Sequence, residues 1–168
     1  IRDRSSYLSA ACEKKGLNTL MKFLENVKKE DLIDDNKTFV SFELFEHLYD
    51  PKAFLEILNN LMNKKDLFIF TTLSGMGLDI RTLWENSKAV SPPMHLNFLN
   101  PKSINLLLEK VGFEVIEVNT PGKLDIDIMH NNKKHVKDKF WKDFLDYSNE
   151  KEKQLMQKHL SDNRLSSH

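Results

Sequence analysis

The sequence predicts an α/β protein with a mostly parallel sheet, followed by a helical C-terminal segment. Short runs of β-forming residues, 38–42 and 67–72, alternate with segments whose apolar residues recur at helical spacing. A further helix-to-strand unit occupies residues 101–118, and beyond residue 130 the composition becomes Lys-rich and helical. Strands that alternate with helices of this length are typical of βαβ units, which build parallel sheets.

The first half of the chain predicts a helix, a strand and a second helix. Residues 5–15 favour a short helix with a serine cap, and Gly16 stands just past its end. The β-rich run 38–42 predicts a strand. Pro51 then lies in the first turn of a helix that Asp50 caps. The apolar residues of that helix share one face. They are Phe54, Leu55, Leu58, Leu61 and Met62.

The second half continues the alternation. The apolar run 67–72 predicts a strand that is buried on both sides. Asn100 caps the next helix and Gly112 ends it. Alternating apolar and polar residues then predict two more strands, at 113–118 and at 124–128.

Two amphipathic stripes follow residue 130 and predict two helices. The first stripe comprises Val136, Phe140, Trp141, Phe144 and Leu145. The second comprises Leu155, Met156 and Leu160. We therefore expect residues 1–129 to form an α/β domain and residues 130–168 to form a helical segment that packs on it.

Composition excludes several classes of function. The 168 residues carry 25 Lys and Arg against 25 Asp and Glu, so a formal net charge of zero gives no argument for nucleic acid. The single cysteine, Cys12, cannot form an internal disulfide, which predicts a reducing, cytoplasmic location. No apolar run approaches the roughly 20 residues of a membrane span. The Gly75-Met76-Gly77 pair lacks a third glycine and follows the wrong strand, so no phosphate-cradling loop is predicted.

The densest group of reactive side chains follows the strand at 38–42. Glu43, Glu46 and His47 share one face if this segment makes a helical turn, and His95 could converge from the loop beyond the next strand. Two carboxylates with imidazoles could bind a divalent cation or act as acid and base. In the alternative interpretation, the two glutamates are solvated or cap the following helix and His47 packs at its start.

Asp3 is a second candidate. A carboxylate between a strand end and a helix can hold the two hydroxyls of a ribose. The alternative is a helix cap or a frayed chain end.

The order of these pieces resembles that of class I S-adenosylmethionine-dependent methyltransferases. Residues 39–51 contain an apolar strand, then Glu-x-x-Glu-His-x-x-Asp-Pro, then an amphipathic helix. The strand at 67–72 and the unit from His95 to Val118 follow in the same order, so that the resemblance spans residues 3–128. It implies a doubly wound, Rossmann-like sheet whose cofactor site lies at the carboxyl ends of its first strands.

The resemblance also implies roles for individual residues. Asp3 matches the acidic residue that holds the cofactor ribose, and Leu24 and Glu25 match the neighbourhood of the adenine. The positions that match the methionine side of the cofactor are Ser41, Phe42 and Glu43. Some members of the family that methylate quinone precursors or RNA ends hold a divalent metal with a similar motif and a later histidine. The matching positions here are Glu43, Glu46, His47 and His95.

We therefore expect methyl transfer to a small-molecule or sugar acceptor, with His47 or His95 as the base that removes a proton. The family's first strand with its glycine-rich loop would precede Ile1, and its last strand would follow residue 168. For this reason we expect a fragment that is inactive or impaired as it stands. The rival hypothesis is a non-catalytic α/β domain that serves binding or assembly.

Overall fold

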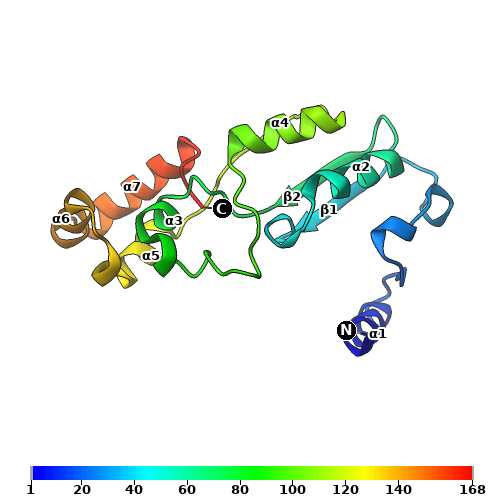
Figure 1. The fold of residues 1–168 in the computed structure, drawn as a ribbon, viewed down its shortest axis with the longest axis horizontal. Helices are drawn as coiled ribbons and strands as arrows, with labels where there is room; N and C mark the ends of the chain where they lie inside the picture. Colours follow the sequence, from blue (N-terminus) through cyan, green and yellow to red (C-terminus); the bar gives the residue numbers. More distant parts are fainter. Residues whose placement is uncertain (1, 168) are drawn as a thin grey trace. The chain divides into compact units, whose positions relative to one another are not determined.

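A computed structural model describes residues 2–167, and the side chains from residue 6 to residue 167 (Figure 1). The chain divides into two compact units, Ile1–Asp35 and Asn36–His168. No helix among the described residues is long and apolar enough to cross a lipid bilayer.

The first unit contains α1 (Arg2–Glu13) and two short 3-10 turns, η1 (Leu24–Asn26) and η2 (Lys29–Asp31). The helix predicted at 5–15 is present and begins earlier than expected. Asp3 therefore lies within α1 instead of following a strand, and its side chain lies outside the described residues. The Lys22 ammonium lies 2.5 Å from Asp31 Oδ1. This hydrogen bond is the main reason why the pKa of Asp31 lies below its ordinary value.

The second unit holds two strands and six α-helices among its described residues, with short 3-10 turns between them. In chain order these elements are β1 (Thr38–Phe42), η3 (Phe45–His47), α2 (Pro51–Leu61), β2 (Leu67–Thr71), α3 (Leu78–Leu83), η4 (Trp84–Asn86), α4 (Pro101–Val111), α5 (Asp125–Asn131), η5 (Lys133–His135), α6 (Lys139–Tyr147) and α7 (Glu150–Asp162).

The two strands form a parallel βαβ unit with α2 as the crossover. The register runs from Thr38 opposite Leu67 to Phe42 opposite Thr71. Asp66 fastens the amino-terminal end of this sheet, because its carboxylate accepts the backbone N–H groups of Asn63 (2.8 Å) and Lys37 (3.0 Å). These bonds, above all the one from Asn63, lower the pKa of Asp66, and the Lys37 ammonium adds to the effect from 3.2 Å.

One face of the sheet is covered and the other is exposed, so the prediction that residues 67–72 are buried on both sides was wrong. Phe68 and Phe70 pack into a core with the fully buried Phe45, and α2 and α4 supply its remaining walls. On the opposite face Val40 and Ile69 are more than half exposed. An uninterrupted apolar run therefore does not by itself distinguish a strand covered on two faces from one covered on a single face.

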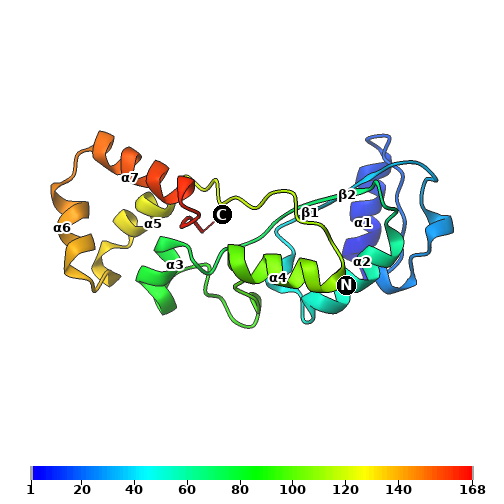
Figure 2. The same cartoon turned by 90° about the horizontal axis from the view of Figure 1, so that it is seen from above.

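A second core joins α3, α5, α6 and α7. Its buried residues are Leu83, Ile126, Met129, Val136, Leu145 and Leu160. Figure 2 shows α5 and α7 side by side in this region, in agreement with the contacts between these two helices. The two stripes predicted beyond residue 130 are helical except for Val136, which precedes α6. They contribute Val136, Leu145 and Leu160 to this core, whereas Phe140 and Leu155 are exposed.

The two late strands predicted from alternation are absent from the described structure. Residues 124–128 lie in and beside α5, since Ile126 and Met129 are three residues apart and bury one helical face. Residues 113–118 are extended, with Phe113, Val115 and Val118 packed against the first core, yet they join no ladder. The alternating apolar residues of 113–118 bury one side of an extended segment, and this segment has no partner strand among the described residues.

The last described residues form a strap, residues 165–167, which packs against α3 and α5. Leu165 accepts the N–H of Leu78 (3.0 Å), and Ser167 accepts the N–H of Ser74 (2.7 Å). Gly77 makes this approach possible, because a Cβ at that position would overlap the backbone of Ser167. The strap thereby closes the end of the second core.

Candidate functional site

Three of the four predicted metal ligands come together at the carboxyl end of β1. Glu46 and His47 belong to η3, the turn that leaves β1, and His95 comes from the loop between η4 and α4. Potential ligand atoms of the three side chains all lie within 4.8 Å of one another, and the two imidazole rings have centroids 4.7 Å apart. Glu46 is only 2% exposed. We call these residues the Glu46 group.

Both imidazoles are held by their Nδ1 atoms. His47 Nδ1 lies 2.8 Å from the carbonyl oxygen of Met94, and His95 Nδ1 lies 2.6 Å from that of Ala89. A carbonyl oxygen can only accept a hydrogen bond, so each Nδ1 carries a proton, and in the neutral imidazole Nε2 is then the nitrogen with the lone pair. Histidines that ligate metals in proteins are commonly oriented by this kind of bond.

Glu46 is anchored through both its side chain and its backbone. The Thr72 hydroxyl donates to Glu46 Oε2 (2.9 Å), while the Glu46 carbonyl oxygen accepts the N–H groups of Leu96 (2.6 Å) and Asn97 (3.2 Å). The Asn97 amide donates in turn to the carbonyl oxygens of Phe45 and Leu48, at 3.1 and 2.5 Å. These bonds clamp the loop of His95 onto η3 and fix the spacing of the group.

The group suits a cation. Glu46 is buried and has no ion pair among the residues that the structure describes, and a buried carboxylate is costly unless a positive charge pairs with it. Two imidazole nitrogens and one carboxylate oxygen form a donor set that first-row divalent metals accept.

Glu43, the fourth predicted ligand, lies outside the Glu46 group. Its backbone has a positive φ of 49°, so the chain turns before η3 begins and Glu43 does not share a helical face with Glu46. Its carboxylate accepts the Thr71 hydroxyl (2.6 Å), and its N–H donates to the Thr71 carbonyl (3.1 Å). Glu43 therefore joins the carboxyl ends of the two strands.

The residues expected to hold a cofactor lie in both units. Leu24 and Glu25 belong to η1 of the first unit, as Asp3 belongs to α1. In the second unit, Phe42 is 64% exposed at the end of β1, whereas the Ser41 hydroxyl is buried without a hydrogen-bond partner among the described residues. An orphaned hydroxyl at this end of a parallel strand fits a ligand that donates or accepts there.

A second acidic cluster was missed by sequence analysis, which placed Asp125 on a half-exposed strand. Asp125 is buried, and its carboxylate accepts Gln157 Nε2 (2.8 Å), the Ser167 N–H (2.9 Å) and the Ser166 hydroxyl. Burial, with the nearby charge of Asp125 as a second cause, raises the pKa of Asp79 to about 6. Nothing in the local pattern marks either aspartate, because the donors come from α7 and the strap.

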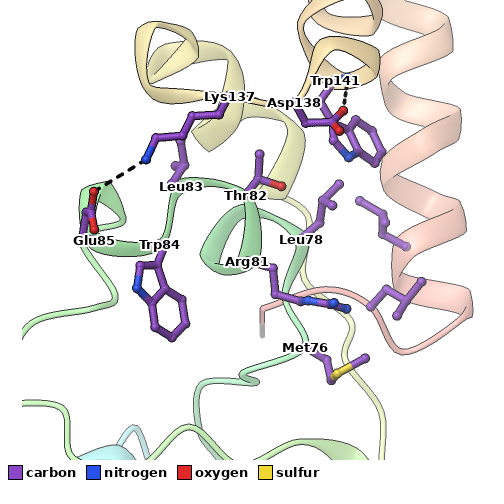
Figure 3. Close-up of a pocket in the computed structure, with 12 residues that line it drawn as sticks. Met76, Leu78, Arg81, Thr82, Leu83, Trp84, Glu85, Lys137, Asp138 and Trp141 are labelled. Atoms are coloured by element: carbon purple, nitrogen blue, oxygen red, sulfur yellow. Dashed lines mark hydrogen bonds and ion pairs between the residues drawn. The ribbon is translucent and has the colours of Figure 1, made fainter.

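A pocket opens beside the second core, between α3, η4, α6 and the end of α7 (Figure 3). Arg81, Trp84 and Trp141 contribute to its wall. Trp141 belongs to the first amphipathic stripe predicted beyond residue 130, whereas no sequence pattern marks Arg81 or Trp84.

Comparison with known proteins gives one match. A family model described as a methyltransferase domain matches residues 10–118, which is more than half of the 168 residues. No curated protein and no solved structure matches the chain. The matched stretch includes β1, β2 and the whole Glu46 group.

Proposed function

The chain belongs to the methyltransferase domain family, and on this premise we propose that it transfers the methyl group of S-adenosylmethionine to a small-molecule or sugar acceptor. The observation that carries the proposal is the Glu46 group, at the carboxyl end of β1 and within the matched residues. Ligands of parallel α/β sheets bind beyond the carboxyl ends of the strands. Membership of this family makes the chain an enzyme of the transferase class.

We further propose that the Glu46 group holds one divalent metal ion through Glu46, His47 Nε2 and His95 Nε2. When bound, such an ion supplies a Lewis acid that binds an acceptor hydroxyl and lowers its pKa. The protein contributes the orientation, because backbone carbonyls fix both imidazoles and Thr72 fixes one carboxylate oxygen.

For the cofactor, the place of three residues at the end of β1 supports their assignment, and the family resemblance alone implies the others. Ser41, Phe42 and Glu43 lie where β1 ends and would hold the methionine side of S-adenosylmethionine. Asp3 would bind the ribose, and Leu24 with Glu25 would border the adenine, as the family resemblance implies. The cofactor supplies an electrophilic methyl group when bound.

The chain's own task is alignment and proton removal. Holding the acceptor oxygen in line with the methyl group makes the step effectively unimolecular. As the oxygen–carbon bond forms, the carbon–sulfur bond breaks and the acceptor proton must leave. Without a metal, the Nε2 of His47 or His95 is the base that receives this proton.

Metal binding is the sharpest test of the site. The full chain would be titrated with Mn²⁺, and bound metal would be counted by elemental analysis, in wild type, His95→Gln and His159→Gln. We expect one ion per wild-type chain and a loss of about 10-fold to 100-fold or more in affinity in His95→Gln. His159 is an exposed residue of α7 outside the group, so His159→Gln is the matched control. Equal binding in all three proteins would remove the metal site from the proposal.

Cofactor binding tests the methyltransferase assignment separately. Calorimetric titration of the full-length protein with S-adenosylmethionine would compare wild type with Asp3→Ala and Ser41→Ala. We expect saturable binding that both substitutions weaken. A full-length wild-type protein that binds no cofactor would contradict the assignment and favour a non-catalytic binding domain.

A further inference from the structure

The pocket beside the second core has the size of a small-molecule site. Its volume is about 610 Å³, and both tryptophans of the chain, Trp84 and Trp141, line it with Arg81 (Figure 3). Pockets of a few hundred cubic ångströms, walled by apolar and aromatic groups with a few polar ones, commonly bind small ligands. The lining contains no member of the Glu46 group, so this is a separate feature of the molecule.

Trp84 is held in a conformation that its own packing does not explain. Its backbone has a φ of 48° and a ψ of −117°, a region that favours glycine, and its side chain is 64% exposed. Figure 3 shows the indole projecting away from Leu83. Strained backbone tends to persist at binding sites, and an exposed indole offers a flat face on which a ring can stack.

The charges around the pocket leave Arg81 unmatched. Lys137 Nζ lies 3.9 Å from Glu85 Oε1, and Asp138 accepts the N–H of Trp141 (3.0 Å) as the cap of α6. Among the residues that the structure describes, the Arg81 side chain has no hydrogen bond or ion pair. A free guanidinium in a pocket is suited to a carboxylate or phosphate, which it binds through two parallel hydrogen bonds.

The pocket also borders the segment that follows β2. This segment leaves the sheet at the carboxyl end, which is where a ligand is expected. Its wall includes Met76 and Leu78, which follow the carboxyl end of β2, and the bond from Leu78 to the strap holds this segment in place. Because β1 and β2 are parallel, the chain leaves both strands at the same edge of the sheet. The segment that carries the pocket and the segment that carries the Glu46 group therefore both start at the carboxyl ends of these strands.

We propose that this pocket binds a small ring compound bearing a carboxylate or phosphate group. The ring stacks on Trp84 and the anionic group pairs with Arg81. This recognition of a ring with an anion depends on the pocket alone and not on the proposed function.

The two tryptophans allow a direct test without cofactor. Their two indole N–H signals in the NMR spectrum of the full chain would report occupancy of the pocket. The probes are 3,4-dihydroxybenzoate and glucose 6-phosphate, each compared with its neutral counterpart, 3,4-dihydroxybenzyl alcohol or glucose. We expect at least one anionic probe to shift the Trp84 signal saturably and to bind about tenfold or more tightly than its counterpart. The responding pair identifies the ring as aromatic or sugar.

Variants connect the effect to the proposed contacts. Arg81→Gln is expected to abolish the preference for the anionic probe, and Trp84→Phe to weaken both members of the pair, with occupancy read from Trp141. Lys139→Gln removes an exposed lysine of α6 that does not line the pocket, and binding should be unchanged. The proposal is overturned if no probe shifts either indole signal, or if Arg81→Gln keeps the preference. Probe binding by a chain that fails to bind S-adenosylmethionine would overturn the proposed function and leave the pocket chemistry standing.

Discussion

Two buried carboxylates of the second unit, Glu46 and Asp125, lie in opposite surroundings. Beside Glu46 lie two imidazoles, each of which presents a lone pair at Nε2 when neutral, and one threonine hydroxyl. Around Asp125 the Gln157 amide, the Ser166 hydroxyl and the Ser167 N–H all donate to the carboxylate, and the Asp79 carboxyl lies beside it as well. A carboxylate ringed by donors is satisfied as an anion, whereas one beside lone pairs favours a cation. We therefore expect the same chemical group to be structural in one region and a metal ligand in the other.

The largest expected effect is the loss of stability when the Asp125 carboxylate is removed. Asp125→Ala leaves three buried donors without their acceptor and should lower the free energy of unfolding by about 3–5 kcal/mol. Asp127→Ala, an exposed carboxylate of the same helix, is the control and should change it by less than about 0.5 kcal/mol. Urea denaturation measures both. Equal effects of the two substitutions would show that Asp125 is not the structural carboxylate that its hydrogen bonds indicate.

Added metal is expected to act on the other carboxylate only. Mn²⁺ or Zn²⁺ at about 100 times its dissociation constant should stabilise the wild-type chain by about 2.7 kcal/mol. Glu46→Gln keeps the shape of the side chain but removes its charge, so most of this gain should vanish, while Asp125→Asn should retain it. Thermal unfolding with and without metal provides the measurement. A gain that survives in Glu46→Gln would show that the ion binds elsewhere.

Asp79, the acidic neighbour of Asp125, should make the stability of this region depend on pH. The folded protein holds the Asp79 proton up to about pH 6, whereas the unfolded chain releases it near the ordinary value of 3.8. Protonated Asp79 therefore stabilises the fold at low pH, and this contribution is lost as the pH rises from about 4 through about 6. Relative to Asp79→Asn, the wild type should lose on the order of 2 kcal/mol across that range. If the free energy of unfolding depended on pH in the same way in both proteins, the raised pKa of Asp79 would be contradicted.

The smallest expected effect comes from the hydroxyl that orients Glu46. Thr72→Val keeps the shape of the side chain and removes one hydrogen bond, so it should cost about 1 kcal/mol of stability and about tenfold in metal affinity. Thr82→Val, in α3, is a matched control for metal affinity, because Thr82 is not part of the Glu46 group. The two readouts come from urea denaturation and Mn²⁺ titration. A metal affinity equal to that of wild type would show that Thr72 does not position the carboxylate.

Elements whose start and end are both encoded locally were predicted from the sequence. Asp50 caps α2 by accepting the N–H of Ala53 (2.9 Å), Asn100 caps α4 in the same manner, and Gly112 ends α4 with a φ of 97°. The strand at 38–42 was also confirmed. Each of these signals acts over a few residues, which is why one sequence suffices to detect it.

Elements that depend on a partner were not predicted. Alternation at 113–118 and 124–128 looked like strands, but a strand needs a neighbouring ladder, and the structure provides one-sided packing or a helix instead. The burial of Asp125 was missed for the same reason. Its hydrogen-bond donors belong to α7 and to the strap, far away in the chain.

The sequence by itself determined that Glu46 and His47 follow a strand and that the chain carries the order of a methyltransferase domain. Only the tertiary structure decided which side chains meet. Backbone bonds from Leu96 and Asn97 to the Glu46 carbonyl bring His95 to the group, while a positive φ turns Glu43 away from it. Local sequence patterns show how residues are spaced along the chain. The convergence of ligands is decided by hydrogen bonds between segments that the chain places far apart.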